Sequence, residues 1–520
     1  MEPMIIDDEQ VYRETVPGTI EEEYIAEKIR SILERYSDET IMVETPVITW
    51  IEKECRIEIG GKTIKCHAMP YVEKTSLEAP IAVAIIERGA IIVDKPVQGK
   101  IVFIPTPRNL DNIKYIALEM AVLGARAVGF YDIIGGRYRR KVVTGGYYYN
   151  TRYGAPPPIP VVSVRREDVT AIEKHGDTKA ILHIDSDVKQ GVGKTIIGIK
   201  KGLSSETIHV SAHHDHWFAG YRDDVAGVET VLRLAKKLYK EKTRHTIYYV
   251  LFTAEESGAP NYADWYWGWG SRYMLEIMKN TGEITGITAN LNIDCVDQGH
   301  PCLTGNPVLT RYAETIGVKK CGYDDPDFDS FQYTIHGIPA ATLEELDNML
   351  EIYHTDQDTK KNASPEAIDR YVEITYSLLR LVDEKPLSYQ PLRKYIIDRL
   401  DKAGTSVETK RLIGTIDKLD EKISPREAIR LVTASLTNII YEPGIGGLFY
   451  ADIIPEIELV KHSLTEHHYP LRIRIYSLEG VITDNIVKDK ETLRKLIQSS
   501  VEERINLYLE KLESKLCISM

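Results

Sequence analysis

Between residues 193 and 385, apolar segments of strand length alternate with segments of helical periodicity. The segment HTIYYVLFTA (245–254) is apolar on both faces, which is typical of a central strand covered by helices. The segment VAGVETVLRLAKKLYK (225–240) instead places its apolar residues along one helical face. This alternation predicts an α/β domain with a mixed, mostly parallel sheet.

The chain has 520 residues, which is too long for a single hydrophobic core, so we expect further domains around the α/β domain. Short β-branched segments with one or two helices precede it, and helical signals dominate the residues that follow. The latter include a capping box at Ser424 and Glu427 and a long amphipathic segment at 489–516. We therefore expect an N-terminal part of the α/β domain, an inserted β-rich domain, the main α/β domain and a mainly helical C-terminal domain, at residues 1–74, 75–190, 191–385 and 386–520.

Bulk composition excludes several classes of protein. A net charge of −13 argues against general nucleic-acid binding, and we interpret the local basic stretch GGRYRRK (135–141) as a solvated loop. No apolar run approaches the roughly 18–20 residues that cross a bilayer, so we expect no membrane partner. The N-terminus, MEPMIIDDEQ, is acidic and lacks a signal-peptide pattern, so the cytoplasm is the expected location.

The six cysteines stand at positions 55, 66, 295, 302, 321 and 517, and no two have the CxxC spacing of a cysteine zinc site. A chain of this length does not need a disulfide framework to be stable. Cys55 and Cys66 can pair across a hairpin, but we expect free buried thiols.

Acidic and imidazole side chains follow four predicted strands of the α/β domain, and one more acid precedes its amphipathic helix. These residues are His213, Glu255 with Glu256, Asp294, His354 and Asp223. In open α/β sheets the carboxyl ends of the strands form the ligand crevice, so we expect these side chains to converge there. Carboxylates and imidazoles delivered to one crevice are what a divalent metal needs.

The chemistry of the side chains predicts how two metals are shared. His213 and Asp294 hold one metal, Glu256 and His354 hold the other, and Asp223 bridges both through its two oxygens. Ligation by nitrogen and oxygen without thiolate favours zinc, with cobalt or manganese as alternatives. Two metals about 3.5–4 Å apart activate a water and polarise a carbonyl, which predicts hydrolysis.

Neighbouring residues are expected to support this chemistry. Glu255 is the candidate general base, and the Tyr353 phenol can donate a hydrogen bond to a developing oxyanion. Asp215 is expected to bind the second ring nitrogen of His213 through its carboxylate, and Asp224 is expected to cap the following helix. Three other histidines of the cluster are interpreted as bystanders: His209, His214 and His216.

Five stretches of this sequence resemble the di-zinc exopeptidases of the M28 family: AHHDHWFAGYRDDVAG, FTAEESG, NIDCVD, DSFQYTIHGIP and YHTDQDT. The resemblance implies the same five metal ligands and the same base, with a peptide as substrate. The form HxDxWxxGxxD is most similar to the branch that holds glutamate carboxypeptidase II and the transferrin receptor. That branch implies that 75–190 is a protease-associated domain and that 386–520 is a dimerisation domain of a homodimer.

The chain departs from the family pattern in the aromatic loop SGAPNYADWYWGWGS, which carries Trp267. This loop is interpreted either as a packed surface loop or dimer contact, or as a wall of the substrate pocket. Asp297 is an extra acid near the site. Arg222 is a candidate for gripping a substrate carboxylate, with a surface role as the alternative.

The expected activity is that of an aminopeptidase, because an acidic crevice attracts a free ammonium group. A carboxypeptidase of the glutamate type is the alternative within this chemistry, and it needs basic groups near the site. Glutaminyl cyclase uses one zinc, so the complete ligand set argues against it. A catalytically silent, receptor-like scaffold is the remaining alternative, but no ligand is missing here.

Overall fold

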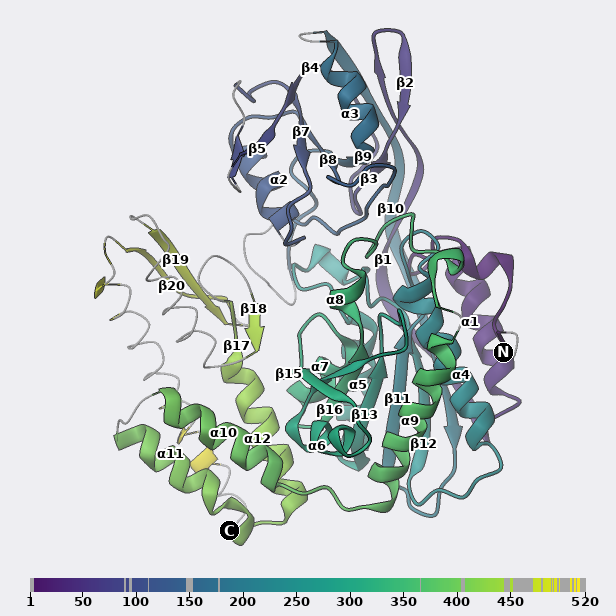
Figure 1. Cartoon of the computed structure of the whole chain (residues 1–520), viewed down its shortest axis with the longest axis vertical. Helices are drawn as coiled ribbons and strands as arrows, with labels where there is room; N and C mark the ends of the chain where they lie inside the picture. The colour runs from purple at the N-terminus through teal and green to yellow at the C-terminus, as the bar shows by residue number, and fades with distance from the viewer. Residues whose placement is uncertain are drawn as a thin grey trace.

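The structure is a computed structural model, and its described residues cover most of the chain up to residue 451. They are residues 4–87, 90–92, 96–110, 112–145, 153–175, 178–364, 366–403, 407–443, 449–451, 471–477, 480–487, 489, 491–492, 495, 506, 509–510 and 512–514. Figure 1 shows a β-rich unit above an α/β core, with the C-terminal helices beside that core.

The α/β core is built on a mixed sheet in the order β15-β14-β16-β13-β11-β12-β10. Four neighbouring strands are parallel: β11 (Thr207–His213), β12 (Thr246–Phe252), β13 (Ile287–Ile293) and β16 (Ala340–Glu344). Three strands extend the two sides: β10 (Lys179–Lys200), antiparallel to β12, β14 (Cys302–Gly305), antiparallel to β16, and β15 (Lys319–Gly322), parallel to β14. The predicted mixed, mostly parallel sheet is confirmed.

Helices cover both faces of this sheet, as the apolar character of β12 predicts. One face packs against α1 (Ile20–Leu33), α4 (Ala226–Leu238), α6 (Pro307–Thr315) and α9 (Ala367–Glu384) in one buried cluster. The other face packs against α5 (Trp269–Thr281) and α7 (Asp329–Ile335). Thr19 caps the N-terminus of α1, because its side chain accepts a hydrogen bond from the Glu22 amide.

A long two-stranded ribbon joins the core to the β-rich unit. β1 (Glu39–Ile59) pairs antiparallel with β10 over almost its whole length, and β2 (Lys62–Lys65) turns back along its upper end. The expected domain boundary at 190 therefore falls inside a continuous strand. Figure 1 shows both strands rising from the core into the upper unit.

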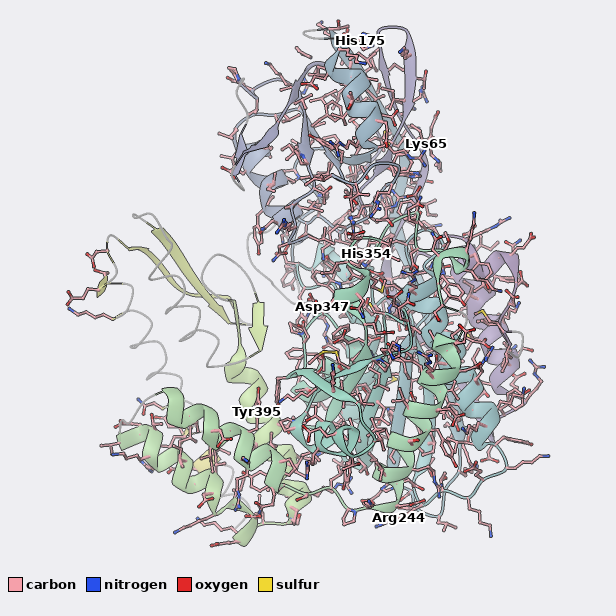
Figure 2. All side chains as sticks on the ribbon, in the orientation of Figure 1. Lys65, His175, Arg244, Asp347, His354 and Tyr395 are labelled. Atoms are coloured by element: carbon pink, nitrogen blue, oxygen red, sulfur yellow. A yellow bond between two sulfur atoms is a disulfide. The ribbon has the colours of Figure 1, made fainter. Side chains whose placement is uncertain are left out.

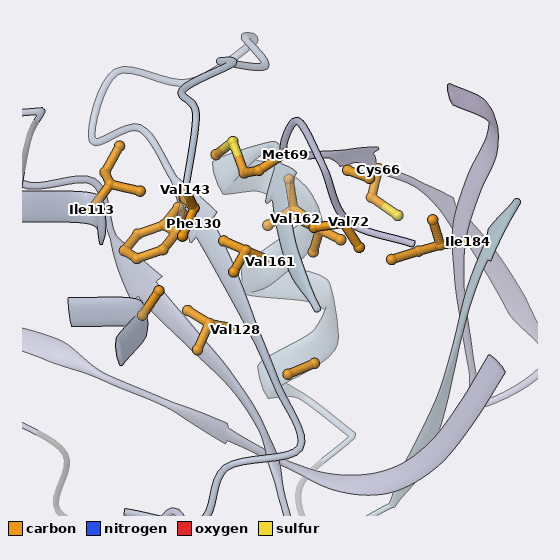
Figure 3. Packing of buried hydrophobic residues seen from close by; sticks show 14 of the residues in the cluster. Cys66, Met69, Val72, Ile113, Val128, Phe130, Val143, Val161, Val162 and Ile184 are labelled. Carbon is orange, nitrogen blue, oxygen red and sulfur yellow. The ribbon is translucent and has the colours of Figure 1, made fainter. Parts of the chain in front are cut away.

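The β-rich unit continues the same sheet beyond β10, where β4 (Thr75–Val83) pairs antiparallel with β10, and most of its strands are parallel to one another. Its other strands are β3 (His67–Ala68), β7 (Ile101–Pro105), β8 (Ala127–Tyr131) and β9 (Val161–Val164), with β5 (Ile85–Glu87) and β6 (Ala90–Ile92) as a separate pair. Its helices are α2 (Asn112–Val122) and α3 (Arg166–Glu173). Figure 3 shows part of its core, where Ile113 of α2 lies near Phe130 and Val161 of the sheet.

The C-terminal part begins with three helices: α10 (Gln390–Ala403), α11 (Val407–Asp417) and α12 (Pro425–Ile440). The capping box is confirmed, because the Ser424 amide binds the Glu427 carboxylate and the Glu427 amide binds the Ser424 hydroxyl. Two strand pairs follow, β17 (Tyr441–Pro443) with β18 (Phe449–Ala451) and β19 (Leu471–Ser477) with β20 (Gly480–Val487). The segment 489–516 lies largely outside the described residues. Among the described helices, none has the length and apolarity to span a membrane.

Two disulfides are present: Cys55–Cys66 joins β1 to the residue between β2 and β3, and Cys302–Cys321 joins β14 to β15. The expectation of free thiols at these four positions is therefore wrong, because β pairing brings their backbones within 5.1 and 5.6 Å between Cα atoms. Cys295 remains a free, buried thiol.

Candidate metal centre

The candidate site lies at the carboxyl ends of the parallel strands. His213 is the last residue of β11, Glu256 lies in the loop after β12, and Asp294 directly follows β13. Asp223 lies in the turn before α4, and His354 lies in the loop after α8 (Leu346–Met349). All five side chains are at most 4% exposed. Figure 2 labels His354 where the upper unit meets the core.

The structure brings the five predicted ligands together as two groups that share Asp223. Nε2 of His213 lies 3.2 Å from Oδ1 of Asp223 and 3.8 Å from Oδ1 of Asp294. Nε2 of His354 lies 3.3 Å from Oδ2 of Asp223 and 2.9 Å from Oε2 of Glu256. Burial lowers the pKa of His213, but Asp223 and Asp294 outweigh it and hold that pKa well above its ordinary value.

The donor atoms of these groups fit a bound metal. Four of them are buried and, although they lie close to one another, make no hydrogen bond of acceptable geometry among the described residues: His213 Nε2, Asp223 Oδ2, Glu256 Oε1 and His354 Nε2. An unsatisfied buried polar atom costs about 1–3 kcal/mol, so four in one place are unfavourable unless something binds them. Donor atoms in each group lie within 4.8 Å of one another, and an imidazole with carboxylates is a set that zinc accepts.

Asp215 supports the site in a different way from the one predicted. Nδ1 of His213 is 2.9 Å from the backbone carbonyl of Asp215, and 3.9 Å from its carboxylate. The carboxylate instead accepts hydrogen bonds from the amides of Glu255 and Glu256, at 3.0 and 3.1 Å. The predicted carboxylate–imidazole bond is therefore wrong, because the chain turns after β11 and presents a carbonyl to the ring. Asp215 ties the β11 loop to the β12 loop.

Two residues that the sequence reasoning missed also hold ligands in place. The Trp217 indole N–H donates to Oε2 of Glu256 at 3.0 Å. The Asp358 carboxylate accepts from the amides of Arg222 and Asp223, at 3.1 and 3.2 Å. Both residues stand in quoted motifs, HxDxWxxGxxD and YHTDQDT, and this was the available signal.

Backbone strain is concentrated beside the predicted ligands. Ala254, Cys295 and His354 have φ values of 55°, 53° and 59°, a region that non-glycine residues rarely adopt. Ala254 precedes Glu255, and Cys295 follows Asp294. Such strain persists only where surrounding contacts impose it, and it often marks a functional site.

Glu255 and Tyr353 lie at the same place. Glu255 is 3% exposed, its amide binds Asp215, its carbonyl accepts from Gly268 at 3.0 Å, and burial raises the pKa of its carboxyl well above the ordinary value. The Tyr353 ring stacks on His354 with centroids 3.7 Å apart. Burial and then the nearby carboxylate of Glu256 raise the pKa of the Tyr353 phenol. Their roles as base and oxyanion donor stay predictions.

The remaining histidines of the cluster bind elsewhere: His209 contacts the Tyr333 hydroxyl, His214 contacts Glu22, and His216 contacts the Val11 carbonyl. Asp224 does not cap α4. Its carboxylate accepts from the His213 amide at 3.3 Å, and Val225 occupies the N-cap position.

The candidate substrate residues are engaged in protein contacts. Arg222 is buried and pairs with Asp297, Nη1 to Oδ1 at 2.9 Å, and its other terminal nitrogen donates to the Asn362 carbonyl. Trp267 is 2% exposed, and its ring stacks on Tyr266 with centroids 4.2 Å apart. These contacts favour packing roles for Arg222 and for the aromatic loop.

The basic stretch 135–141 is not the solvated loop that was expected. Arg139, Arg140 and Lys141 are buried. The Arg140 guanidinium binds Glu14 and Glu52, and its amide donates to the His354 carbonyl at 2.9 Å. The expectation fails for Arg140 because two acids far away in the sequence neutralise its guanidinium, and the stretch supports the His354 loop from the β-rich unit.

Comparison with known proteins agrees with this geometry. Residues 195–379 match the model of peptidase family M28. This segment is therefore similar to the M28 peptidases. It holds all five predicted ligands, and the family supports a metal-dependent peptidase.

The chain is also similar to proteins of known structure or sequence. A zinc aminopeptidase from Bacillus subtilis is 19% identical, with a TM-score of 0.55 over 72% of this chain and 92% of its own. A peptidase M28 precursor from Shewanella amazonensis is 19% identical, with a TM-score of 0.58 over the same shares. The probable leucine aminopeptidase 2 of Aspergillus fumigatus is 26% identical over 253 residues, which is 48% of this chain and 47% of that protein. The structural relatives establish the fold.

Proposed function

We propose that this protein is a zinc aminopeptidase that removes residues from the free N-terminus of peptides. The observation that carries the proposal is the pair of buried donor groups that share Asp223 and leave four donor atoms without hydrogen bonds among the described residues. His213 and Asp294 would hold one zinc ion, Glu256 and His354 the other, and Asp223 both. When bound, such ions polarise a carbonyl and make water more acidic. Cobalt or manganese could replace zinc.

The protein's own residues would do the remaining work. Glu255 would take the proton of the attacking water and pass it to the leaving amine. Its backbone is held on both sides, by the Asp215 carboxylate and by the Gly268 amide, so the point from which its side chain starts is fixed before substrate binds. Tyr353 would donate a hydrogen bond to the developing oxyanion.

An aminopeptidase is preferred because the centre is acidic. Several buried carboxylates surround it, and they attract the ammonium group of a free N-terminus. A carboxypeptidase needs a cation for the terminal carboxylate, and Arg222 already pairs with Asp297. Zinc aminopeptidases are also among the relatives in structure.

A panel of peptides with free and acetylated N-termini tests this proposal by mass spectrometry. We expect zinc-loaded protein to shorten only the free peptides, from the N-terminus. Trimming of acetylated peptides from the C-terminus would replace the proposal with a carboxypeptidase. Absence of cleavage with two zinc ions bound would support a receptor-like scaffold.

Glu255→Gln tests the assigned base. We expect this variant to keep both zinc ions and to lose about 10²–10⁴-fold in turnover, the usual contribution of a general base. Glu276→Gln, on the exposed surface of α5, is the control and should retain both. Near-wild-type turnover in Glu255→Gln would show that another group is the base.

The resemblance also implies a protease-associated domain at 75–190 and a homodimer through 386–520, and both remain proposals. Sedimentation analysis tests the homodimer. The cytoplasmic location is less well supported, because disulfides persist mainly in oxidising compartments or in heat-adapted cells. Alkylation of thiols in intact source cells, before lysis, would show whether the disulfides exist there.

A further inference from the structure

Three residues of zinc-binding type meet at one side of the sheet, apart from the five ligands described above. Cys302 lies in β14, Cys321 in the adjacent strand β15, and Glu344 ends β16, where it pairs directly with Cys302. The two cysteine sulfurs, joined here as a disulfide, and a carboxylate oxygen lie within 4.8 Å of one another. Because the residues come from three strands, no spacing along the chain reveals them.

The carboxylate of Glu344 is held against the sulfur of Cys302. Oε1 lies 3.1 Å from Sγ of Cys302 and accepts a hydrogen bond from the Thr304 hydroxyl at 2.8 Å. Oε2 accepts from the Leu346 amide at 2.9 Å, and the side chain is 7% exposed. Glu344 is therefore oriented before anything binds.

This contact suits the reduced cysteine better than the disulfide. A disulfide sulfur has no hydrogen to donate, so the oxidised pair offers the buried carboxylate oxygen nothing at that contact. A thiol can donate to the oxygen, and a cation held by thiolates would attract it. Cys321 is exposed, so a reductant can reach the disulfide and a water can complete a tetrahedral site.

We propose that Cys302, Cys321 and Glu344 bind a zinc ion once the Cys302–Cys321 disulfide is reduced. A dithiol supplies two electrons and two protons, the S–S bond breaks, two thiols form, and the dithiol closes to a cyclic disulfide. Zinc then displaces the two thiol protons to solvent and is held by two thiolates and one carboxylate. This proposal does not depend on the peptidase activity.

The second disulfide provides a matched control. Cys55 and Cys66 also join neighbouring strands, but among the described residues no group of three potential ligands includes them. The double variant Cys55→Ser/Cys66→Ser should therefore behave as wild type in zinc binding.

The experiment compares full-length protein before and after dithiol treatment and desalting without oxygen. Each form is loaded with zinc, and the metal per chain is measured; cobalt loading gives a second readout. We expect the reduced protein to take up about one more ion per chain and to show a thiolate-to-cobalt charge-transfer band, which carboxylate and imidazole ligands do not produce.

Cys302→Ser should lose both signals, and Glu344→Gln should bind the extra ion at least about tenfold more weakly. Three results would each overturn the proposal: equal metal content in both redox states, wild-type affinity in Glu344→Gln, or a Cys302–Cys321 disulfide that the dithiol cannot open in the folded protein. Loss of the extra ion in the Cys55→Ser/Cys66→Ser variant would also overturn the proposal, because it would show that Cys55 and Cys66, and not Cys302 and Cys321, bind that ion.

Discussion

Replacing Trp217 by phenylalanine should weaken one half of the candidate metal centre. The indole N–H donates to Oε2 of Glu256 at 3.0 Å, and Trp217 is 3% exposed, so water does not replace the lost donor. Phenylalanine keeps an aromatic ring in the same core but has no donor. A hydrogen bond to a charged group contributes about 1.5–3 kcal/mol, and loss of such a supporting contact typically lowers metal affinity about 10–100-fold.

Zinc removal by a graded series of chelator concentrations measures this effect. We expect Trp217→Phe to release one zinc ion at a chelator concentration about 10–100-fold lower than wild type needs. The second ion should be released at nearly the wild-type concentration. Trp265→Phe is the matched control, because Trp265 is equally buried and its indole donates to the Pro326 carbonyl. If both variants release zinc as wild type does, the Trp217 contact does not hold Glu256 as a ligand.

Two further predictions concern stability, measured by urea unfolding of the metal-free protein. Asp264→Asn should lower the free energy of unfolding by about 3–5 kcal/mol, because it removes the carboxylate that lies 3.1 Å from the buried Lys114 ammonium; adding Lys114→Met should recover most of the loss, and equal instability of both variants would contradict this. Burial raises the pKa of Asp324 to about 8, above its unfolded value, so the unfolded state releases a proton that the folded state keeps and stability falls as pH rises from about 4 to 8, by up to about 1.4 kcal/mol per pH unit. Asp324→Asn should remove only this residue's contribution to the slope, because other buried acids such as Asp358 also have a raised pKa, while the exposed Asp347→Asn control keeps the full slope; an unchanged slope in Asp324→Asn would mean that Asp324 is already ionised.

The sequence alone predicted the features that depend on local pattern. Apolar segments such as 245–254 predicted a covered central strand, and the position of a residue just after a strand predicted where it would converge with others. His213 and Asp294 meet for this reason, since parallel strands end at one edge. The structure adds the distances, and the metal-binding roles remain to be measured.

Features that depend on distant parts of the chain could not be read from sequence. Arg140 was expected in solvent, because nothing near it in the sequence indicates Glu14 or Glu52 as partners. The pairing of Cys302 with Cys321 depends on β14 and β15 lying side by side. For Asp215 the residue was identified, but whether its carbonyl or its carboxylate faces His213 depends on the turn of one loop.

The ribbon of β1 and β10 determines how the two halves of the molecule can move. Nineteen residue pairs connect the two strands, so at about 3.4 Å per residue the ribbon is roughly 60 Å long. A paired ribbon of this length is a rigid connection rather than a flexible linker. A rotation of the β-rich unit away from the core would bend this ribbon and break the hydrogen bond from the Arg140 amide to the His354 carbonyl. If the proposed peptidase activity holds, entry of a peptide would depend on local loop motion, and the upper unit would act as a fixed wall that limits the size of the substrate.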